Sequence, residues 1–265
     1  MITKETKLQA LQQMVAKGKI NQHIFKYRAV GKFTDAIFNE HTLWFSHPNE
    51  FNDPFDCWAN IQSVNQIGLN DLVQQNALTK QESNICKKGI EFFTPEMLKE
   101  DVDKVMNRLG ICCFCKIERQ ILMWSNYSDY HKGICLQFDI FEDPDFFTTA
   151  LPVNYVEKMP TYDHFNERNK ILEKIIQPKS QNEWGYEEEI RIVKTDRDIY
   201  LNGNRQAFKF NPTSLKKVIF GCKASDDTID KYMKLCNKDN HLEHVNFSRM
   251  AQKTDGLFEL VEIPL

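Results

Sequence analysis

Two glutamates and an arginine stand at alternating positions in the stretch 184–193, which reads WGYEEEIRIV. In a β-strand, successive side chains point to opposite faces. If Ile190 points to the core, Glu187, Glu189 and Arg191 share the other face, with the two carboxylates about 7 Å apart. Such neighbours raise the pKa of one carboxyl group, while the guanidinium lowers the pKa of the other. The pattern predicts a pair that stabilises a developing positive charge and polarises a sugar hydroxyl. The alternative is a solvated strand with cross-strand ion pairs.

A second polar stretch, residues 49–56, reads NEFNDPFD and follows a β-rich run. Pro54 disfavours the αR region for Asp53, and the side chains of Asn52 and Asp53 can bond to nearby backbone amides. These features predict a stiff loop or the start of a helix at Pro54. A binding role and a purely structural Asx turn are equally compatible with them.

Aromatic and polar residues are mixed over residues 123–135, MWSNYSDYHKGIC, directly before a β-rich run. The rings of Trp124 or Tyr127 could stack on a nicotinamide or adenine base, whereas the alternative for Trp124 is a place in the core. His131 lacks metal-type spacing to other ligands, so we expect a structural role for it. The chain has no GxGxxG, GxxxxGK[ST], GxSxG or HExxH motif, which speaks against Rossmann dehydrogenases, kinases, serine hydrolases and zincins.

The composition predicts a folded protein without a strong charge bias. Of 265 residues, 42% are hydrophobic and 12% aromatic, and the net charge is −3. This balance argues against a dedicated duplex-DNA binder, although a local basic groove stays open. Apolar runs are too short to cross a bilayer and lysines interrupt the first 20 residues, so we expect a cytoplasmic protein without a membrane partner. The eight cysteines are expected to be reduced and mostly buried, and no metal site is expected.

Strand and helix patterns alternate irregularly, which favours an α+β fold. We expect one domain over residues 1–265, with a helical insertion at about 65–108 that covers part of a sheet. The other expected helices span residues 5–17, 33–40, 119–128, 164–176 and 225–236. The expected strands span residues 24–28, 42–46, 110–116, 132–140, 184–193, 218–220, 245–247 and 257–263.

Five segments together resemble an uncharacterised bacterial family, domain of unknown function 2971. They are residues 25–28, 43–56, 113–115, 123–135 and 184–191, in the family's order. The resemblance extends over roughly residues 24–222, and its NDPFD and WxYExExR elements are fairly specific. Cys115 departs from the family's pattern, which has Ser or Thr at this position.

An early arginine, a Ser/Thr strand in mid-chain and a late Glu-x-Glu strand are also similar to the Arg–Ser–Glu arrangement of ADP-ribosyltransferases. This resemblance implies a mixed, mostly antiparallel split sheet, with NAD bound in a cleft and consumed as a substrate. It implies that Glu189 is the catalytic carboxylate, that Glu187 orients the acceptor, and that Arg28 binds the NAD phosphates. The other residues assigned to NAD binding are Tyr27, Ser46 (with Cys115 as the alternative Ser/Thr position), Asn52, Asp53, Trp124, Tyr127 and Arg191.

The leading hypothesis is therefore an NAD-consuming enzyme, by ADP-ribosyl transfer or NAD glycohydrolysis, of a superfamily that often serves in toxins or phage defence. It requires Arg28 and Glu189 to line one concavity, and it leaves the protein or nucleic-acid acceptor and the oligomeric state open. One alternative is a metal-dependent nuclease or phosphoesterase in which Asp53, Asp56, Glu187 and Glu189 hold Mg²⁺. The other is a non-catalytic module that binds a nucleotide or a protein.

Overall fold

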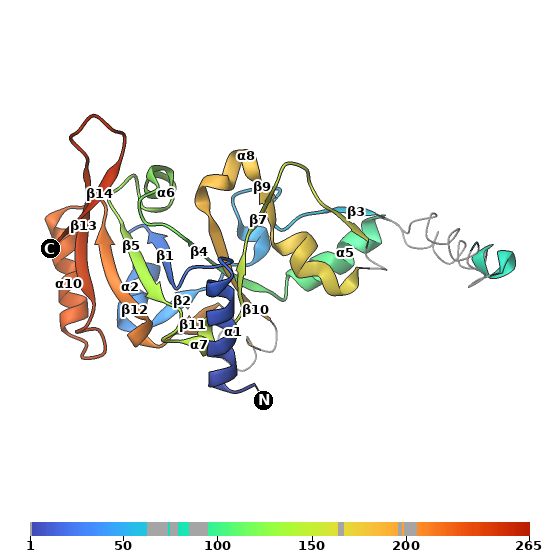
Figure 1. The fold of residues 1–265 in the computed structure, drawn as a ribbon, viewed down its shortest axis with the longest axis horizontal. Helices are drawn as coiled ribbons and strands as arrows, with labels where there is room; N and C mark the ends of the chain where they lie inside the picture. The colour runs from blue at the N-terminus through green and yellow to red at the C-terminus, as the bar shows by residue number, and fades with distance from the viewer. Residues whose placement is uncertain are drawn as a thin grey trace. The chain divides into compact units, whose positions relative to one another are not determined.

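The computed structural model describes residues 2–62, 74, 79–84, 95–163, 167–195, 198 and 206–265 (Figure 1). The chain divides into two compact units. The first unit comprises Met1–Ser46, Gly110–Val153 and Glu183–Leu265, and the second comprises His47–Leu109 and Asn154–Asn182. That residues 1–265 form one domain stays a prediction.

The first unit is built on an eight-stranded sheet in the order β14-β13-β12-β5-β1-β4-β10-β6. Its strands are β1 (His23–Arg28), β4 (Gly110–Cys115), β5 (Ile134–Asp139), β6 (Ala150–Pro152), β10 (Glu189–Lys194), β12 (Leu215–Phe220), β13 (Asn246–Gln252) and β14 (Leu260–Pro264). Neighbouring strands run antiparallel except β12 and β13, which are parallel. The expected mixed, mostly antiparallel sheet with several helices is confirmed.

The sheet is narrowly joined between β1 and β4. Their register is a single pair, Phe25 with Cys115, whereas β1 pairs with β5 along its whole length. Beyond that pair the Nζ of Lys26 donates to the carbonyl of Cys113 at 2.8 Å, so a side chain replaces a backbone hydrogen bond. An ADP-ribosyltransferase-like split sheet stays a prediction.

Alternation along the strands gives the sheet two different faces. One face carries Ile24, Leu136 and Ile190 and packs in the main core with helices α1 (Lys4–Ala16), α2 (Lys32–Asn39), α7 (Pro144–Phe147) and α10 (Asp226–Asn237). The other face carries Phe25 and Tyr27 and packs in a smaller core with α6 (Ile121–Tyr127). Any strand residue can therefore be assigned to one of two environments. We call the face with Ile24, Leu136 and Ile190 the α2 face, and the face with Phe25 and Tyr27 the α6 face.

The remaining elements of the first unit are short. Strands β2 (Thr42–Trp44) and β11 (Ala207–Lys209) form a separate antiparallel pair. A 3₁₀ turn, η5, covers Pro212–Ser214. Helix α8 (Gln181–Trp184) begins in the last two residues of the second unit and ends in the first, where the 3₁₀ turn η4 (Gly185–Glu187) leads into β10.

The second unit contains short strands and helices. Strand β3 (Asn60–Gln62) pairs in parallel with β8 (Thr161–Asp163), and β7 (Asn154–Val156) pairs in parallel with β9 (Pro178–Ser180). Its helical elements are η1 (Pro48–Glu50), α5 (Pro95–Met106), η2 (Arg168–Lys170) and η3 (Leu172–Ile176). Helix α5 confirms the last part of the predicted helical insertion. Residues 63–73, 75–78 and 85–94 of that region lie outside the described residues.

Most expected elements of the first unit are confirmed within a few residues, but the strand predicted over 184–193 is wrong in its first half. The chain is helical through Glu187, and Glu188 turns it with a left-handed φ of 42°. Strand β10 begins only at Glu189. Three consecutive glutamates at 187–189 do not mark where a strand begins, and the structure buries Glu187 and exposes Glu188 in the turn before β10.

Most of the described cysteines are buried, as expected. Cys57, Cys112, Cys115, Cys135 and Cys236 are buried thiols, and Cys113 and Cys222 are half-buried thiols. Among the described residues, no helix has the length and apolar character that crossing a bilayer requires.

Candidate functional site

Strand β10 places an acidic and a basic side chain together on the α6 face of the sheet. The Nε and Nη2 atoms of Arg191 donate to Oε1 and Oε2 of Glu189 at 2.9 and 3.1 Å. Glu189 is 5% exposed and Arg191 is fully buried, while Ile190 and Ile192 point into the opposite core. The predicted shared face of Glu189 and Arg191 is confirmed. The alternative of a solvated strand is wrong for these residues.

Two thiols of β4 lie beside this ion pair. Cys113 is in register with Arg191 and Cys115 with Glu189. Burial, followed by the charge of Glu189, raises the pKa of the Cys113 thiol. Burial also raises the pKa of Cys115, whose thiol donates to the carbonyl of Ile117 at 3.1 Å. Cys115, where the resemblance leads us to expect Ser or Thr, is thus a protonated, buried thiol bonded to the backbone.

Glu187 reaches the site from η4, outside the strand, so its predicted place on the strand face is wrong. Its side chain is nevertheless buried, at 2% exposed. The hydroxyl of Tyr127, in the last turn of α6, donates to Oε1 of Glu187 at 2.5 Å. A turn and a helix end thus bring a second carboxylate into the same unit, where a phenol fixes its position.

Half-buried aromatic rings lie next to Glu187. Trp184 and Tyr186 have ring centroids 6.3 Å apart, and the Nδ2 of Asn126 donates to the hydroxyl of Tyr186 at 3.0 Å. Tyr127 is also half-buried. These partly exposed rings are the surface on which a planar ligand could stack.

Trp124 and Tyr27, by contrast, are core residues, and their predicted contact with NAD is not what the structure shows. The Trp124 ring is fully buried, its Nε1 donates to the carbonyl of Glu118 at 2.7 Å, and it packs edge-on against Tyr27. Tyr27 is 6% exposed, and its hydroxyl donates to the carbonyl of Ile117 at 3.1 Å. Burial raises the pKa of Tyr27. Neither ring has a free face for a base.

Arg28 lies on the α2 face of the sheet, so the prediction that it shares a concavity with Glu189 is wrong. It follows Tyr27, which points to the α6 face, and strand alternation turns it to the other side. There its Nε approaches Oγ1 of Thr34 in α2, at 3.4 Å. Burial lowers the pKa of the Arg28 guanidinium. The assignment of the NAD phosphates to Arg28 therefore loses its geometric basis.

Ser46, Asn52 and Asp53 lie outside the regular strands. The backbone of Ser46 exchanges two hydrogen bonds with Ile111, at 3.0 and 2.8 Å. In the second unit, Oδ1 of Asp53 accepts from the Phe55 amide at 2.9 Å, which is the expected Asx turn. The following residues form a turn, so a helix start at Pro54 is wrong. The binding roles of Ser46, Asn52 and Asp53 stay predictions.

Residues 123–192 match a family described as Protein of unknown function (DUF2971). This match supports the resemblance to that family, and it contains Tyr127, Glu187, Glu189 and Arg191. Comparison with curated proteins and with solved structures gave no match.

The sequence did not single out three residues of this site, namely Cys113, Asn126 and Tyr186. Asn126 lies within the aromatic and polar stretch 123–135, Tyr186 within the WxYExExR element, and Cys113 within the segment 113–115 that resembles the family. A metal site would require several donor side chains placed close together. In the part of the chain that the structure describes, no three His, Cys, Asp or Glu side chains are placed to hold an ion together. The metal-dependent alternative therefore gains no support from the described residues.

Proposed function

We propose that the protein is an NAD-consuming enzyme that cleaves the bond between nicotinamide and ribose. ADP-ribose is transferred to water or to an acceptor. One observation supports this function above all. Glu189 is a buried carboxylate whose two oxygens are both held by the buried guanidinium of Arg191. A carboxylate fixed in this way keeps its position.

The proposed reaction needs a fixed negative charge more than a proton donor. When the bond from the ribose C1 to the ring nitrogen breaks, its electron pair goes to that nitrogen and neutral nicotinamide leaves. The positive charge that develops at C1 is stabilised by the Glu189 carboxylate, most strongly in a site that excludes water. Water or an acceptor hydroxyl then attacks C1 and releases its proton to solvent.

The other residues around Glu189 have supporting roles in this proposal. Glu187, held by the Tyr127 hydroxyl, orients the acceptor and adds a second negative charge near C1. The half-buried rings of Tyr127 and Tyr186 stack on the nicotinamide. Arg28 and Trp124 take no part, because one lies on the opposite face of the sheet and the other is sealed in the core.

The test is the release of free nicotinamide from NAD, measured by chromatography with purified protein. Water is always present as an acceptor, so the wild-type chain is expected to release nicotinamide above the buffer rate. Glu189→Gln keeps the size of the side chain but removes its charge, and we expect a loss of about 100-fold or more. Glu188→Gln is the matched control, since this neighbouring carboxylate is exposed, and it should keep wild-type activity. The proposal fails if wild type leaves NAD intact or if Glu189→Gln is as active as wild type.

A further inference from the structure

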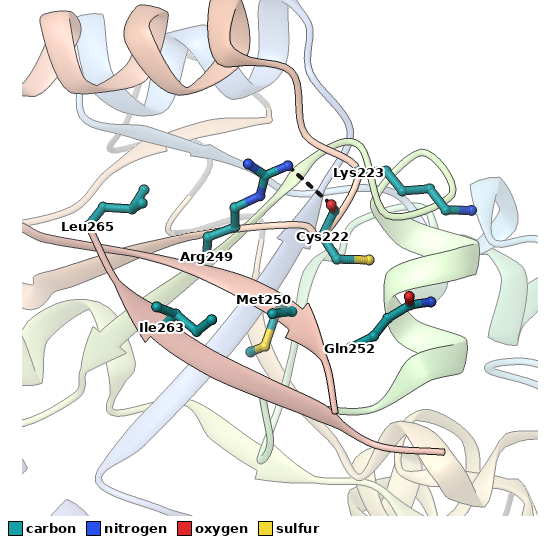
Figure 2. Close-up of a pocket in the computed structure, with 8 residues that line it drawn as sticks. Cys222, Lys223, Arg249, Met250, Gln252, Ile263 and Leu265 are labelled. Atoms are coloured by element: carbon teal, nitrogen blue, oxygen red, sulfur yellow. Dashed lines mark hydrogen bonds between the residues drawn. The ribbon is translucent and has the colours of Figure 1, made fainter. Parts of the chain in front are cut away.

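A cavity of about 440 Å³ lies beside β13 and β14, on the first unit (Figure 2). Its lining residues are Cys222, Lys223, Arg249, Met250, Ala251, Gln252, Ile263 and Leu265. A second hollow of about 430 Å³ shares Cys222, Lys223 and Gln252 with it and adds His131 from the loop after α6. We call the two hollows together the β13 groove.

The lining of the first hollow is cationic. It contains the side chains of Lys223 and Arg249, and none of its described lining residues is acidic. The Nη2 of Arg249 donates to the carbonyls of Cys222 and Ala224, at 3.2 and 3.0 Å, and Figure 2 shows the first of these bonds. These bonds fix the guanidinium before any ligand arrives, which reduces the entropy lost on binding. Lys223 lines the same hollow and is exposed to solvent.

The wall of the groove is held in an unusual backbone conformation. Asp129, Tyr130 and His131 all have positive φ values, of 45°, 52° and 71°. Such a conformation is unfavourable for residues other than glycine. The amide of Lys223 donates to the carbonyl of His131 at 3.0 Å, and a Cβ at Gly221 would lie only 2.0 Å from that oxygen. Because Gly221 has no side chain, its backbone can lie against the His131 carbonyl, and this places His131 beside Cys222 and Lys223.

His131 adds a polar atom to the second hollow. Its Nδ1 is buried and has no hydrogen-bond partner within the described chain. Burial, followed by the charge of Lys223, lowers the pKa of the imidazole. The neutral ring therefore keeps unused hydrogen-bonding capacity at its buried Nδ1, in the wall of the second hollow.

From this arrangement we infer that the β13 groove binds the phosphate group of a phosphorylated small molecule. A phosphate dianion matches the cations Lys223 and Arg249 of the first hollow, whereas a single carboxylate would leave one of them unbalanced. In the second hollow the Glu259 carboxylate is paired with Lys253 at 3.0 Å. Gln252 adds a polar side chain to the lining. Met250 and Ile263 are apolar, and the rest of the ligand would contact them. Five strand spacings of about 4.8 Å put β13 about 24 Å from β10, so this site is separate from Glu189.

Calorimetric titration with inorganic pyrophosphate, ADP and adenosine tests the inference. Pyrophosphate and ADP should bind, and adenosine, which lacks phosphate, should not. Lys223→Gln should weaken both interactions about tenfold, as expected for the loss of one charge-assisted contact. Arg249→Lys should weaken them as well, because the forked geometry is lost while the charge is kept. Lys238→Gln removes an exposed lysine that does not line the groove, and it should bind as wild type does.

Three results would overturn the inference. The first is the absence of binding for both pyrophosphate and ADP at millimolar concentration. The second is equal weakening in Lys238→Gln and Lys223→Gln, which would show a response to net charge alone. The third is the loss of ADP binding in Glu189→Gln with full binding in Lys223→Gln, which would place the ligand at the carboxylate site. Nicotinamide release has no part in this readout, so the groove and the proposed NAD chemistry succeed or fail independently.

Discussion

Two groups of charged residues in the first unit, one at β10 and one at β13, differ in burial and in pairing. At β10, Glu189 and Arg191 are buried and bonded to each other through both carboxylate oxygens. At β13, Lys223 and Arg249 line an open hollow with no acidic side chain among its described lining residues. A buried charge must be paired because its desolvation is costly, whereas a charge at a solvated mouth can wait for a ligand. Glu189 and Arg191 therefore neutralise each other inside the protein, whereas Lys223 and Arg249 are open to a mobile anion.

The largest expected effect comes from breaking the buried pair. Arg191→Met leaves the Glu189 carboxylate buried without this guanidinium, and we expect the free energy of unfolding to fall by about 3–5 kcal/mol. Urea denaturation followed by circular dichroism measures this change. Lys223→Gln, at the open cluster, should alter stability by no more than about 0.5 kcal/mol. Similar losses in the two variants would contradict the contrast between the clusters.

A smaller effect is expected at the glycine that supports the groove. In Gly221→Ala the new methyl group meets the His131 carbonyl, so the backbone must shift at a cost of about 1–3 kcal/mol. Pyrophosphate binding should weaken in the same variant. Gly31→Ala is the control, since a Cβ there meets nothing within 4 Å, and it should change stability by less than about 1 kcal/mol. An unchanged melting temperature in Gly221→Ala would show that the close approach is not needed.

The smallest expected effect concerns His131 and pH. Its pKa is lowered from 6.5 by burial and by Lys223, so the folded chain binds fewer protons than the unfolded chain below about pH 6.5. The stability contributed by the neutral ring is present above that pH and is lost as the pH falls toward the lowered pKa. His131→Gln should therefore show a shallower loss of stability between pH 7 and pH 5, measured by urea denaturation at each pH. Identical dependence of stability on pH in wild type and His131→Gln would contradict this contribution of His131.

Local patterns predicted some of the candidate site correctly. Alternation in EIRIV placed Glu189 and Arg191 on one face and Ile190 and Ile192 on the other, because hydrophobic side chains must face the core. The same rule failed for Glu187, since the left-handed turn at Glu188 interrupts the strand. The run of three glutamates at 187–189 contains no apolar residue that would mark where the turn ends and the strand begins.

Arg28 and Trp124 show a different limit. Both were candidate ligands by residue type, and both have types that also occur in structural roles. Which face of the sheet Arg28 occupies depends on the register and packing of β1, where Tyr27 packs against Trp124 on the α6 face. The type of a residue limits the chemistry of its side chain, and the packing around it determines whether a ligand can contact it.

By itself, the sequence determined the α+β class, the positions of most helices and strands in the first unit, and the shared face of Glu189 and Arg191. These follow from hydrophobic periodicity and chain geometry over a few neighbouring residues. Only the tertiary structure decided that Arg28 and Glu189 occupy opposite faces, that Trp124 is sealed, and that Lys223 and Arg249 share a hollow. Those outcomes depend on which distant segments pack together, and that is set by long-range burial of apolar surface across the whole sheet.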